Sequence, residues 1–244
     1  MKNPQPAQLI LALDLETFEE ARQLIDDVAD VVEMFKVGSQ MFTAQGPFLT
    51  RYLQSKGKKV FLDLKFHDIP NTVASAVKSA VSLSVSPNGD PGFSPLFMLT
   101  VHTAGGQEML EAAAQAAGTQ AKALGVVRPL IVGVTVLTST AKEANLETLV
   151  LERARLAQRA GLDGVVASVE ETALIRREFG PGFLIVTPGI RPAEASFNDQ
   201  KRVATPQAAI SQGSNFLVVG RPIIQAPSPR TAALRILEEM KKEG

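Results

Sequence analysis

The chain has 244 residues, of which 45% are hydrophobic and 20% charged, and its 25 Lys and Arg residues balance its 25 Asp and Glu residues. This balance argues against a nucleic-acid-binding protein that relies on bulk positive charge, and the absence of cysteine excludes disulfides and thiolate metal sites. No apolar run reaches the ~18 residues of a membrane span, and residues 1–6 lack an apolar signal core, so we expect a cytoplasmic protein that binds neither nucleic acid nor membrane.

Apolar, β-prone runs alternate with helical patterns from the first residues to the last. We predict strands over residues 9–14, 31–38, 96–102, 130–137, 164–168, 183–186 and 216–220, and a third strand that begins at Lys59 and runs into the charged stretch before Ile69-Pro70. Helical spacing follows most of them, over residues 16–29, 40–55, 72–83, 105–124, 146–160, 170–179 and 231–242. A helix-capable segment follows the seventh strand.

Eight such units in a chain of this length predict a single-domain (β/α)₈ TIM barrel over residues 1–244. Strands rich in Val, Ile and Leu are typical of a parallel sheet that helices cover. A doubly wound open sheet is the alternative fold. Its dinucleotide-binding version is disfavoured because no GxGxxG motif follows a predicted strand.

The third predicted strand carries the densest cluster of charge. It continues from Lys59 into Phe61-Leu62-Asp63-Leu64-Lys65-Phe66-His67-Asp68-Ile69-Pro70-Asn71-Thr72. Side chains alternate along a strand, so Asp63 and Lys65 share a face, and Asp68 follows three residues after Lys65. A salt-bridged strand end at the surface is one interpretation. An ammonium held between carboxylates as a proton donor is the other, since clustered ionisable groups often mark functional sites.

Polar residues recur at or near the carboxyl ends of the predicted strands, where a barrel places its active site. They are Asp14, Lys36, Asp63, Lys65, Thr138 and Arg221. A random scatter of surface charge would not favour these positions. This coincidence favours an enzyme even before any family is considered.

Two segments near the C-terminus are suited to an anion. Gly220 allows close backbone approach at the end of the eighth strand, and Arg221 can bind a phosphate through two parallel hydrogen bonds. A simple strand-ending turn is the alternative interpretation. The long connection at about 189–204 predicts a lid-like loop over a ligand, or else a flexible surface loop with solvated charges.

The third-strand string resembles the signature of the orotidine 5′-phosphate decarboxylase family. Further matching motifs follow in the expected order: Ala12-Leu13-Asp14, Lys36-Val37-Gly38, Val136-Leu137-Thr138-Ser139, Gly161-Leu162-Asp163-Gly164-Val165-Val166, Val186-Thr187-Pro188-Gly189-Ile190-Arg191-Pro192, Asp199-Gln200 and Gly220-Arg221-Pro222. The resemblance implies cofactor-free and metal-free decarboxylation of orotidine 5′-phosphate to uridine 5′-phosphate, the last step of de novo UMP biosynthesis.

The resemblance also implies a role for each matching catalytic residue. Asp63 should face the departing carboxylate, and Lys65 should deliver the proton to C6 of the pyrimidine as carbon dioxide leaves. Lys36 should bridge the sugar and Asp63, while Asp14 should bind the ribose hydroxyls. Asp68 completes the implied catalytic set.

Other implied roles concern binding and assembly. Thr138 should meet the pyrimidine edge. The phosphate should be held or covered by Arg191, Gln200, Gly220 and Arg221. In this family the residues at the Asp68 and Thr72 positions reach into the neighbouring subunit's site, which implies a homodimer.

The chain departs from the family pattern at about residues 84–95, where a stretch rich in Ser, Pro, Gly and Asn is longer than usual. Because this stretch joins a helix to the next strand, we expect it on the barrel face opposite the site. His67 and His102 lack zinc-like spacing, so we expect hydrogen-bonded structural side chains rather than metal ligands.

Two rival functions stay open at the level of sequence. The first is a metal-dependent sugar-phosphate decarboxylase or aldolase of the same superfamily, which shares the short motif Asp63-x-Lys65-x-x-Asp68. The second is a phosphoribosyl-ligand sensor without catalysis, although a pure binder has no need to retain the charged array.

Overall fold

The structure is a computed structural model that describes residues 6–137, 145–192 and 204–241. Eight parallel strands close into a barrel in sequence order, and β1 pairs with both β2 and β8. The strands are β1 (Gln8–Ala12), β2 (Met34–Gly38), β3 (Lys59–Phe66), β4 (Leu96–His102), β5 (Leu130–Val134), β6 (Gly164–Val166), β7 (Leu184–Thr187) and β8 (Phe216–Val219). The predicted (β/α)₈ barrel is thus confirmed, and the open-sheet alternative is wrong.

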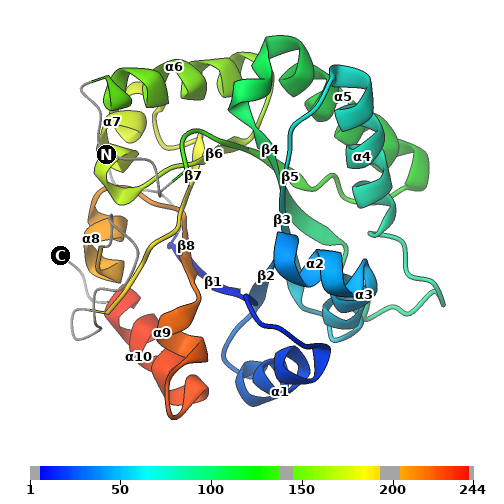
Figure 1. The fold of residues 1–244 in the computed structure, drawn as a ribbon, viewed down its shortest axis with the longest axis vertical. Coiled ribbons are helices and arrows are strands. Elements are labelled where there is room, and N and C mark those ends of the chain that lie inside the picture. The colour runs from blue at the N-terminus through cyan, green and yellow to red at the C-terminus, as the bar shows by residue number, and fades with distance from the viewer. Residues whose placement is uncertain (1–5, 138–144, 193–203, 242–244) are drawn as a thin grey trace.

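Helices form an outer ring around the strands (Figure 1). They are α1 (Phe18–Val28), α2 (Ser39–Gln45), α3 (Phe48–Ser55), α4 (Pro70–Ser82), the 3₁₀ turn η1 (Thr103–Gly105), α5 (Gly106–Leu124), α6 (Leu146–Arg159), α7 (Val169–Phe179), α8 (Pro206–Ser211), α9 (Arg221–Ile224) and α10 (Pro229–Lys241). Within the described ranges, none of these helices has the length and apolar character needed to cross a membrane.

Local chemistry explains where these helices begin and which face they bury. In α1, Thr17 and Glu20 form a reciprocal capping box that satisfies backbone N–H groups at the helix start. The residues with helical spacing, Ala21, Leu24, Ile25 and Val28, are all buried against the barrel. The same division between a buried stripe and a solvated face produces the outer ring.

The predicted single helix over residues 40–55 is wrong. The structure has two helices, α2 and α3, because the chain turns at Gly46 and Pro47. Gly46 adopts a φ of +55°, a conformation that favours glycine, and Pro47 cannot donate a backbone hydrogen bond within a continuing helix. The short helix α8 stands where a helix-capable segment was expected after the seventh strand, whereas α9 has no counterpart among the predicted ranges.

Two apolar layers follow from the alternation of side chains along the strands. One layer fills the barrel and contains Ile10, Ala12, Met34, Phe61, Met98, Val132, Val186, Phe216 and Val218. The other lies between strands and helices and includes Leu62, the neighbour of Phe61. Phe61, Asp63 and Lys65 therefore share the inner face. The polar residues at the carboxyl ends of the strands lie directly above the apolar side chains that fill the barrel.

The segment at residues 84–95 connects α4 to the start of β4. It is fastened to α3 by two hydrogen bonds, from the Ser94 N–H to the Gln54 carbonyl oxygen at 2.9 Å and from the Arg51 guanidinium to the Val85 carbonyl oxygen at 3.4 Å. The Leu96 N–H also donates to the Ser84 hydroxyl at 3.1 Å. The segment thus meets the amino-terminal end of β4, while the polar inner-face residues lie at the carboxyl ends of the strands.

Candidate active site

A cavity of about 230 Å³ opens at the carboxyl ends of the barrel strands. Its apolar walls come from six of the strands and from the loops after β5, β7 and β8, and they consist of Ala12, Phe61, Val134, Val136, Leu137, Val166, Val186, Pro188, Ile190, Val218 and Pro222. Its polar lining consists of Asp14, Lys36, Asp63, Lys65, Arg191 and Arg221, together with Gly189 and Gly220. Such a cavity suits a small ligand with a flat apolar part and several polar groups.

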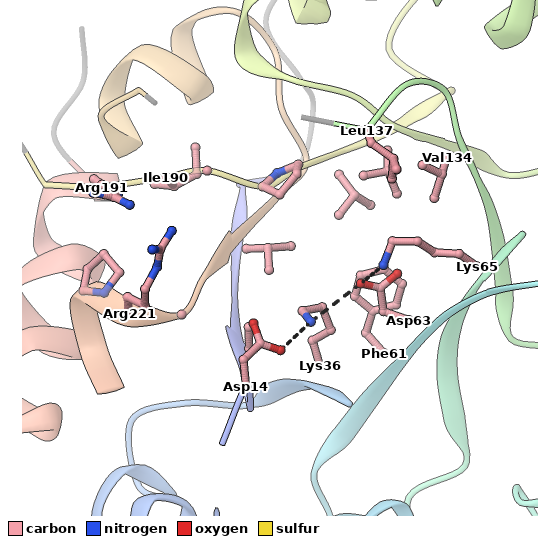
Figure 2. Close-up of a pocket in the computed structure, with 18 of the residues that line it drawn as sticks. Asp14, Lys36, Phe61, Asp63, Lys65, Val134, Leu137, Ile190, Arg191 and Arg221 are labelled. Carbon is pink, nitrogen blue, oxygen red and sulfur yellow. Dashed lines mark hydrogen bonds and ion pairs between the residues drawn. The ribbon is translucent and has the colours of Figure 1, made fainter. Parts of the chain in front are cut away.

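Four charged side chains of alternating sign form a chain along one wall of this cavity (Figure 2). The Lys36 ammonium lies 3.0 Å from Asp14 Oδ1 and 3.6 Å from Asp63 Oδ2. The Lys65 ammonium lies 2.9 Å from the same Asp63 Oδ2. The Asp63 carboxylate is 12% exposed and therefore rests between two ammonium groups with little solvent around it. Within the motif, Asp63 is thus buried, whereas the Lys65 side chain is 36% exposed and Asp68 is exposed.

Gly38 leaves the space that this pairing needs. A Cβ atom at this position would lie 3.0 Å from Lys36 Nζ and 3.4 Å from Asp14 Oδ1. The first distance is tighter than ordinary van der Waals contact, so the Lys36 ammonium would have to shift by a few tenths of an ångström to admit a side chain here. Gly38 thus packs directly against the Lys36–Asp14 pair.

The backbone at Lys65 is unusual. Its φ is +52°, and no other non-glycine residue in the described part of the chain has a positive φ. For an L-residue this conformation costs about 1–2 kcal/mol. Such strain often accompanies functional positions, where the surrounding structure holds it.

A threonine on the next strand contacts both members of the Asp63–Lys65 pair. The Lys65 N–H donates to Thr100 Oγ1 at 2.8 Å, and the Thr100 hydroxyl donates to Asp63 Oδ1 at 3.0 Å. Thr100 is fully buried on the inner face of β4. Thr100 was not among the predicted site residues, because a threonine within a strand is an ordinary β-former.

The two arginines lie on the opposite side of the cavity from Lys65 (Figure 2). Arg191 follows β7 and is buried, while Arg221 begins α9 directly after Gly220 and is partly buried. Gly220 lies close to Asp14, since a Cβ atom there would stand 3.7 Å from Asp14 Oδ2. The cavity therefore has a charge-paired wall and, across from it, a cationic wall.

Some predicted site residues do not line this cavity. Asp68 and Thr72 are exposed on the connection from β3 into α4, and the Asp68 carboxylate accepts a hydrogen bond from the Ile69 N–H at 2.6 Å. Thr138 and Gln200 lie outside the described residues, as does most of the loop at 189–204. The structure thus brings together Asp14, Lys36, Asp63, Lys65, Arg191, Gly220 and Arg221.

The two histidines stack on each other beside the charged chain. Their ring centroids are 5.3 Å apart with an interplanar angle of 20°. His102 Nδ1 accepts a hydrogen bond from the Ala104 N–H at 3.2 Å and so caps η1. Burial, together with the nearby positive groups of His67, Arg153 and Lys65, lowers the pKa of His102 below its ordinary value. Among the residues that the structure describes, no group of three or more His, Cys, Asp or Glu side chains could hold a metal ion.

Comparisons with known proteins agree with this geometry. Residues 7–236 match the model of the "Orotidine 5'-phosphate decarboxylase / HUMPS family". The orotidine 5′-phosphate decarboxylase of Moorella thermoacetica is 46% identical over 96% of this chain and 92% of its own length. That of Halorhodospira halophila is 46% identical over 100% of both chains.

A solved structure gives the same result. The crystal structure of orotidine 5′-phosphate decarboxylase from Lactobacillus acidophilus is 33% identical, covers 97% of this chain and 100% of its own, and superposes with a TM-score of 0.81. The chain therefore belongs to the orotidine 5′-phosphate decarboxylase / HUMPS family.

Proposed function

We propose that the protein decarboxylates orotidine 5′-phosphate to uridine 5′-phosphate, the last step of de novo pyrimidine biosynthesis, in the cytoplasm. The observation that carries this proposal is the chain Asp14–Lys36–Asp63–Lys65 beside an apolar cavity whose opposite wall holds two arginines. The relatives that bear this name match nearly the whole chain, which supports the same reaction here.

The reaction follows from the charged wall. The pyrimidine C6 carboxylate would lie against Asp63, and the bond between C6 and the carboxylate carbon breaks to release carbon dioxide. The electron pair of that bond stays on C6, where the Lys65 ammonium stabilises it electrostatically and then supplies the proton. Lys65 regains its proton from solvent after product release. The protein's own charges are sufficient for this route, which uses neither a metal nor a cofactor.

The remaining cavity residues fit the other parts of the substrate. Asp14 and Lys36 would bind the ribose hydroxyls, with Lys36 also held by Asp63. The phosphate would be bound by Arg191, Arg221 and the backbone beside Gly220, because guanidinium groups bind phosphate through paired hydrogen bonds. Thr138 is proposed to contact the pyrimidine edge, and Gln200 the phosphate.

We further propose that the loop at 189–204 covers the phosphate. Its two ends are tied together, since the Arg191 N–H donates to the Ala204 carbonyl oxygen at 2.9 Å and the Ala204 N–H donates to that of Gly189 at 3.3 Å. The first of these ends forms part of the cavity wall. Phosphate binding could then drive closure and exclude water from the reacting carbon.

We also propose a homodimer in which Asp68 and Thr72 enter the neighbouring subunit's site. Both residues are exposed and stand outside their own cavity, and Ile69 between them is 65% exposed, which supports an interface there. Mixing the Asp68→Ala and Lys65→Ala proteins tests this arrangement. A shared site predicts recovered activity, because each mixed dimer contains one intact site. No recovery in a demonstrated mixed dimer would contradict it.

The reaction itself is tested by mixing the purified protein with orotidine 5′-phosphate, with and without a chelator, and following loss of substrate ultraviolet absorbance. Conversion to uridine 5′-phosphate that is insensitive to the chelator is the expected result. Conversion abolished by the chelator would instead favour a metal-dependent relative. Binding without conversion would favour a ligand sensor.

A further inference from the structure

Strands β3 and β4 pair out of register next to the charged wall. Leu62 pairs with Leu99, and the next partners are Phe66 and Val101. Three residues of β3, numbers 63–65, therefore lie opposite a single residue of β4, Thr100. An irregularity of this kind bends the strand and can redirect a side chain next to an active site.

The irregularity leaves the Lys65 backbone N–H facing a side chain. Its hydrogen bond goes to the Thr100 hydroxyl, at 2.8 Å, and Lys65 holds its positive φ at this point. Thr100 is 0% exposed, so solvent cannot readily take over the bond. The Thr100 hydroxyl thus supports the strained backbone of Lys65, the residue whose ammonium is the proposed proton donor.

The direction of the hydrogen bonds is set by the donor count. A hydroxyl has one hydrogen, and because Thr100 Oγ1 accepts from the Lys65 N–H, its own hydrogen is directed to Asp63 Oδ1 at 3.0 Å. The other carboxylate oxygen, Oδ2, receives the ammonium groups of Lys65 at 2.9 Å and Lys36 at 3.6 Å. The two oxygens of Asp63 therefore have different and fixed partners.

We infer that Thr100 is a positioning residue of the proposed decarboxylation: one buried hydroxyl holds both the Asp63 carboxylate and the Lys65 backbone in the arrangement that faces the substrate. This inference rests on the proposed function. Thr100 acts through Asp63 and Lys65 and does not line the cavity itself. A loss of this support matters because displacement of reacting groups by ~1 Å can cost about 100-fold in rate.

The test compares Thr100→Val, which keeps the shape and removes the hydroxyl, with Thr100→Ser, which keeps the hydroxyl. For orotidine 5′-phosphate we expect Thr100→Val to lower kcat about 10- to 100-fold. KM should stay within about threefold, because the arginine wall lies across the cavity and is untouched. Thr100→Ser should keep kcat within about threefold of the wild type.

Thr172→Val is the matched control. Thr172 of α7 is also 0% exposed, and its hydroxyl donates one hydrogen bond, to the Ser168 carbonyl oxygen at 3.0 Å; neither residue lines the cavity. It should lose thermal stability as Thr100→Val does, with kcat unchanged. If Thr100→Val keeps kcat within twofold, or if Thr100→Ser loses as much as Thr100→Val, the inference is wrong. Should the valine variant not fold, Thr100→Ala removes the same hydroxyl and enters the same comparison.

Amide hydrogen exchange supplies a readout that needs no substrate. The Lys65 amide is protected by Thr100 in the wild type, so we expect its exchange rate to rise at least about tenfold in Thr100→Val and to stay near wild type in Thr100→Ser. Unchanged exchange in Thr100→Val would overturn the contact itself. If the exchange rates of the variants follow this pattern but the wild-type protein does not decarboxylate orotidine 5′-phosphate, the contact stands and the proposed function is wrong.

Discussion

Both ends of the barrel bury charged side chains, but they treat them differently. At the amino-terminal end, the buried Arg176 of α7 donates to the carbonyl oxygens of Gly213 and Phe183, at 2.7 Å and 2.8 Å, and to Asn215 Oδ1 at 2.6 Å. These acceptors are neutral groups at the starts of β7 and β8. At the carboxyl end, the charges of Asp14, Lys36, Asp63 and Lys65 meet one another along a cavity.

The same contrast holds for the carboxylates at the two ends. Asp163, just before β6, receives the Arg128 guanidinium at 2.7 Å and also the Ile131 N–H at 2.7 Å, so it joins two strands. Asp63 receives two ammonium groups and a hydroxyl, and it faces the cavity. A charge that is paired away from the cavity, with backbone groups or with a single counter-charge, supports the fold. One whose partners are other charges beside a cavity is arranged for a ligand.

The largest expected effect is the loss of catalysis in Lys65→Ala. Removal of both the proton donor and the positive charge beside C6 should lower kcat/KM at least about 1,000-fold. Thermal unfolding followed by circular dichroism should show that the fold survives, because this charge belongs to the ligand-facing end. Activity within tenfold of the wild type would show that Lys65 is not the donor.

At the amino-terminal end of the barrel, we expect a substitution to lower stability and to leave activity unchanged. Arg176→Met should lower the free energy of unfolding by about 3 kcal/mol, because it leaves buried acceptors without their donor. The kcat of the folded fraction should stay within about twofold of the wild type, since the charged wall is not touched. Urea denaturation and steady-state kinetics measure the two quantities.

The exposed pair of Arg230 and Asp30 provides the control for this substitution, since the two side chains are 46% and 57% exposed. Arg230→Met should leave the free energy of unfolding almost unchanged, as is usual for surface ion pairs. Two results would contradict the distinction between a fold-supporting amino-terminal end and a ligand-facing carboxyl end. One is an Arg176→Met protein as stable as the Arg230→Met protein, and the other is loss of activity in folded Arg176→Met.

A smaller effect is expected on the stability of two variants at Lys65, where the backbone φ is positive. Lys65→Gly and Lys65→Ala should both be inactive, but the glycine variant should be more stable by about 1 kcal/mol, because glycine adopts a positive φ without steric cost. Chemical denaturation of the two variants measures the difference. An alanine variant as stable as the glycine variant would mean that the backbone there carries no strain.

The smallest effect concerns His102 and pH. Its pKa is lowered in the folded protein from the ordinary 6.5, chiefly by burial, so between the folded and ordinary values the unfolded chain binds more protons. The free energy of unfolding should therefore fall as the pH drops below about 6.5 and stop falling below the folded pKa. His102→Asn, which can retain a cap acceptor for the Ala104 N–H, should flatten this slope between pH 7.5 and 5.5. An unchanged slope would assign the titration to other groups.

The sequence allowed the barrel and most of its charged site to be predicted. Alternation along a strand was enough to place Asp63 and Lys65 on one face, and the strand-end positions of Asp14, Lys36 and Arg221 indicated a common edge. The helix break at Gly46 and Pro47 was visible in principle, because both residues disfavour a continuing helix.

Other features depend on pairing between strands and were not visible. The positive φ of Lys65 and the contacts of Thr100 arise from three residues of β3 lying opposite one of β4, a count that neither strand reveals alone. Strand-end composition also cannot separate Arg191 and Arg221, across the cavity, from the charges on the other wall. The proposed roles of Asp68 and Thr72 depend on a second copy of the chain and stay predictions.

The closure of the barrel by β1 and β8 has a consequence for how the protein is made. Gln8 pairs with Phe216 and Leu11 with Val219. The first strand of the barrel, β1, can therefore complete its pairing only after β8 has left the ribosome. Until then β1 keeps one open edge, which exposes the growing chain to wrong pairing and slows its folding. Because Asp14 follows β1 and Arg221 follows β8, no incomplete nascent chain that stops short of β8 can contain the whole cavity. Binding competence therefore arises only after β8 and the residues that follow it have been made.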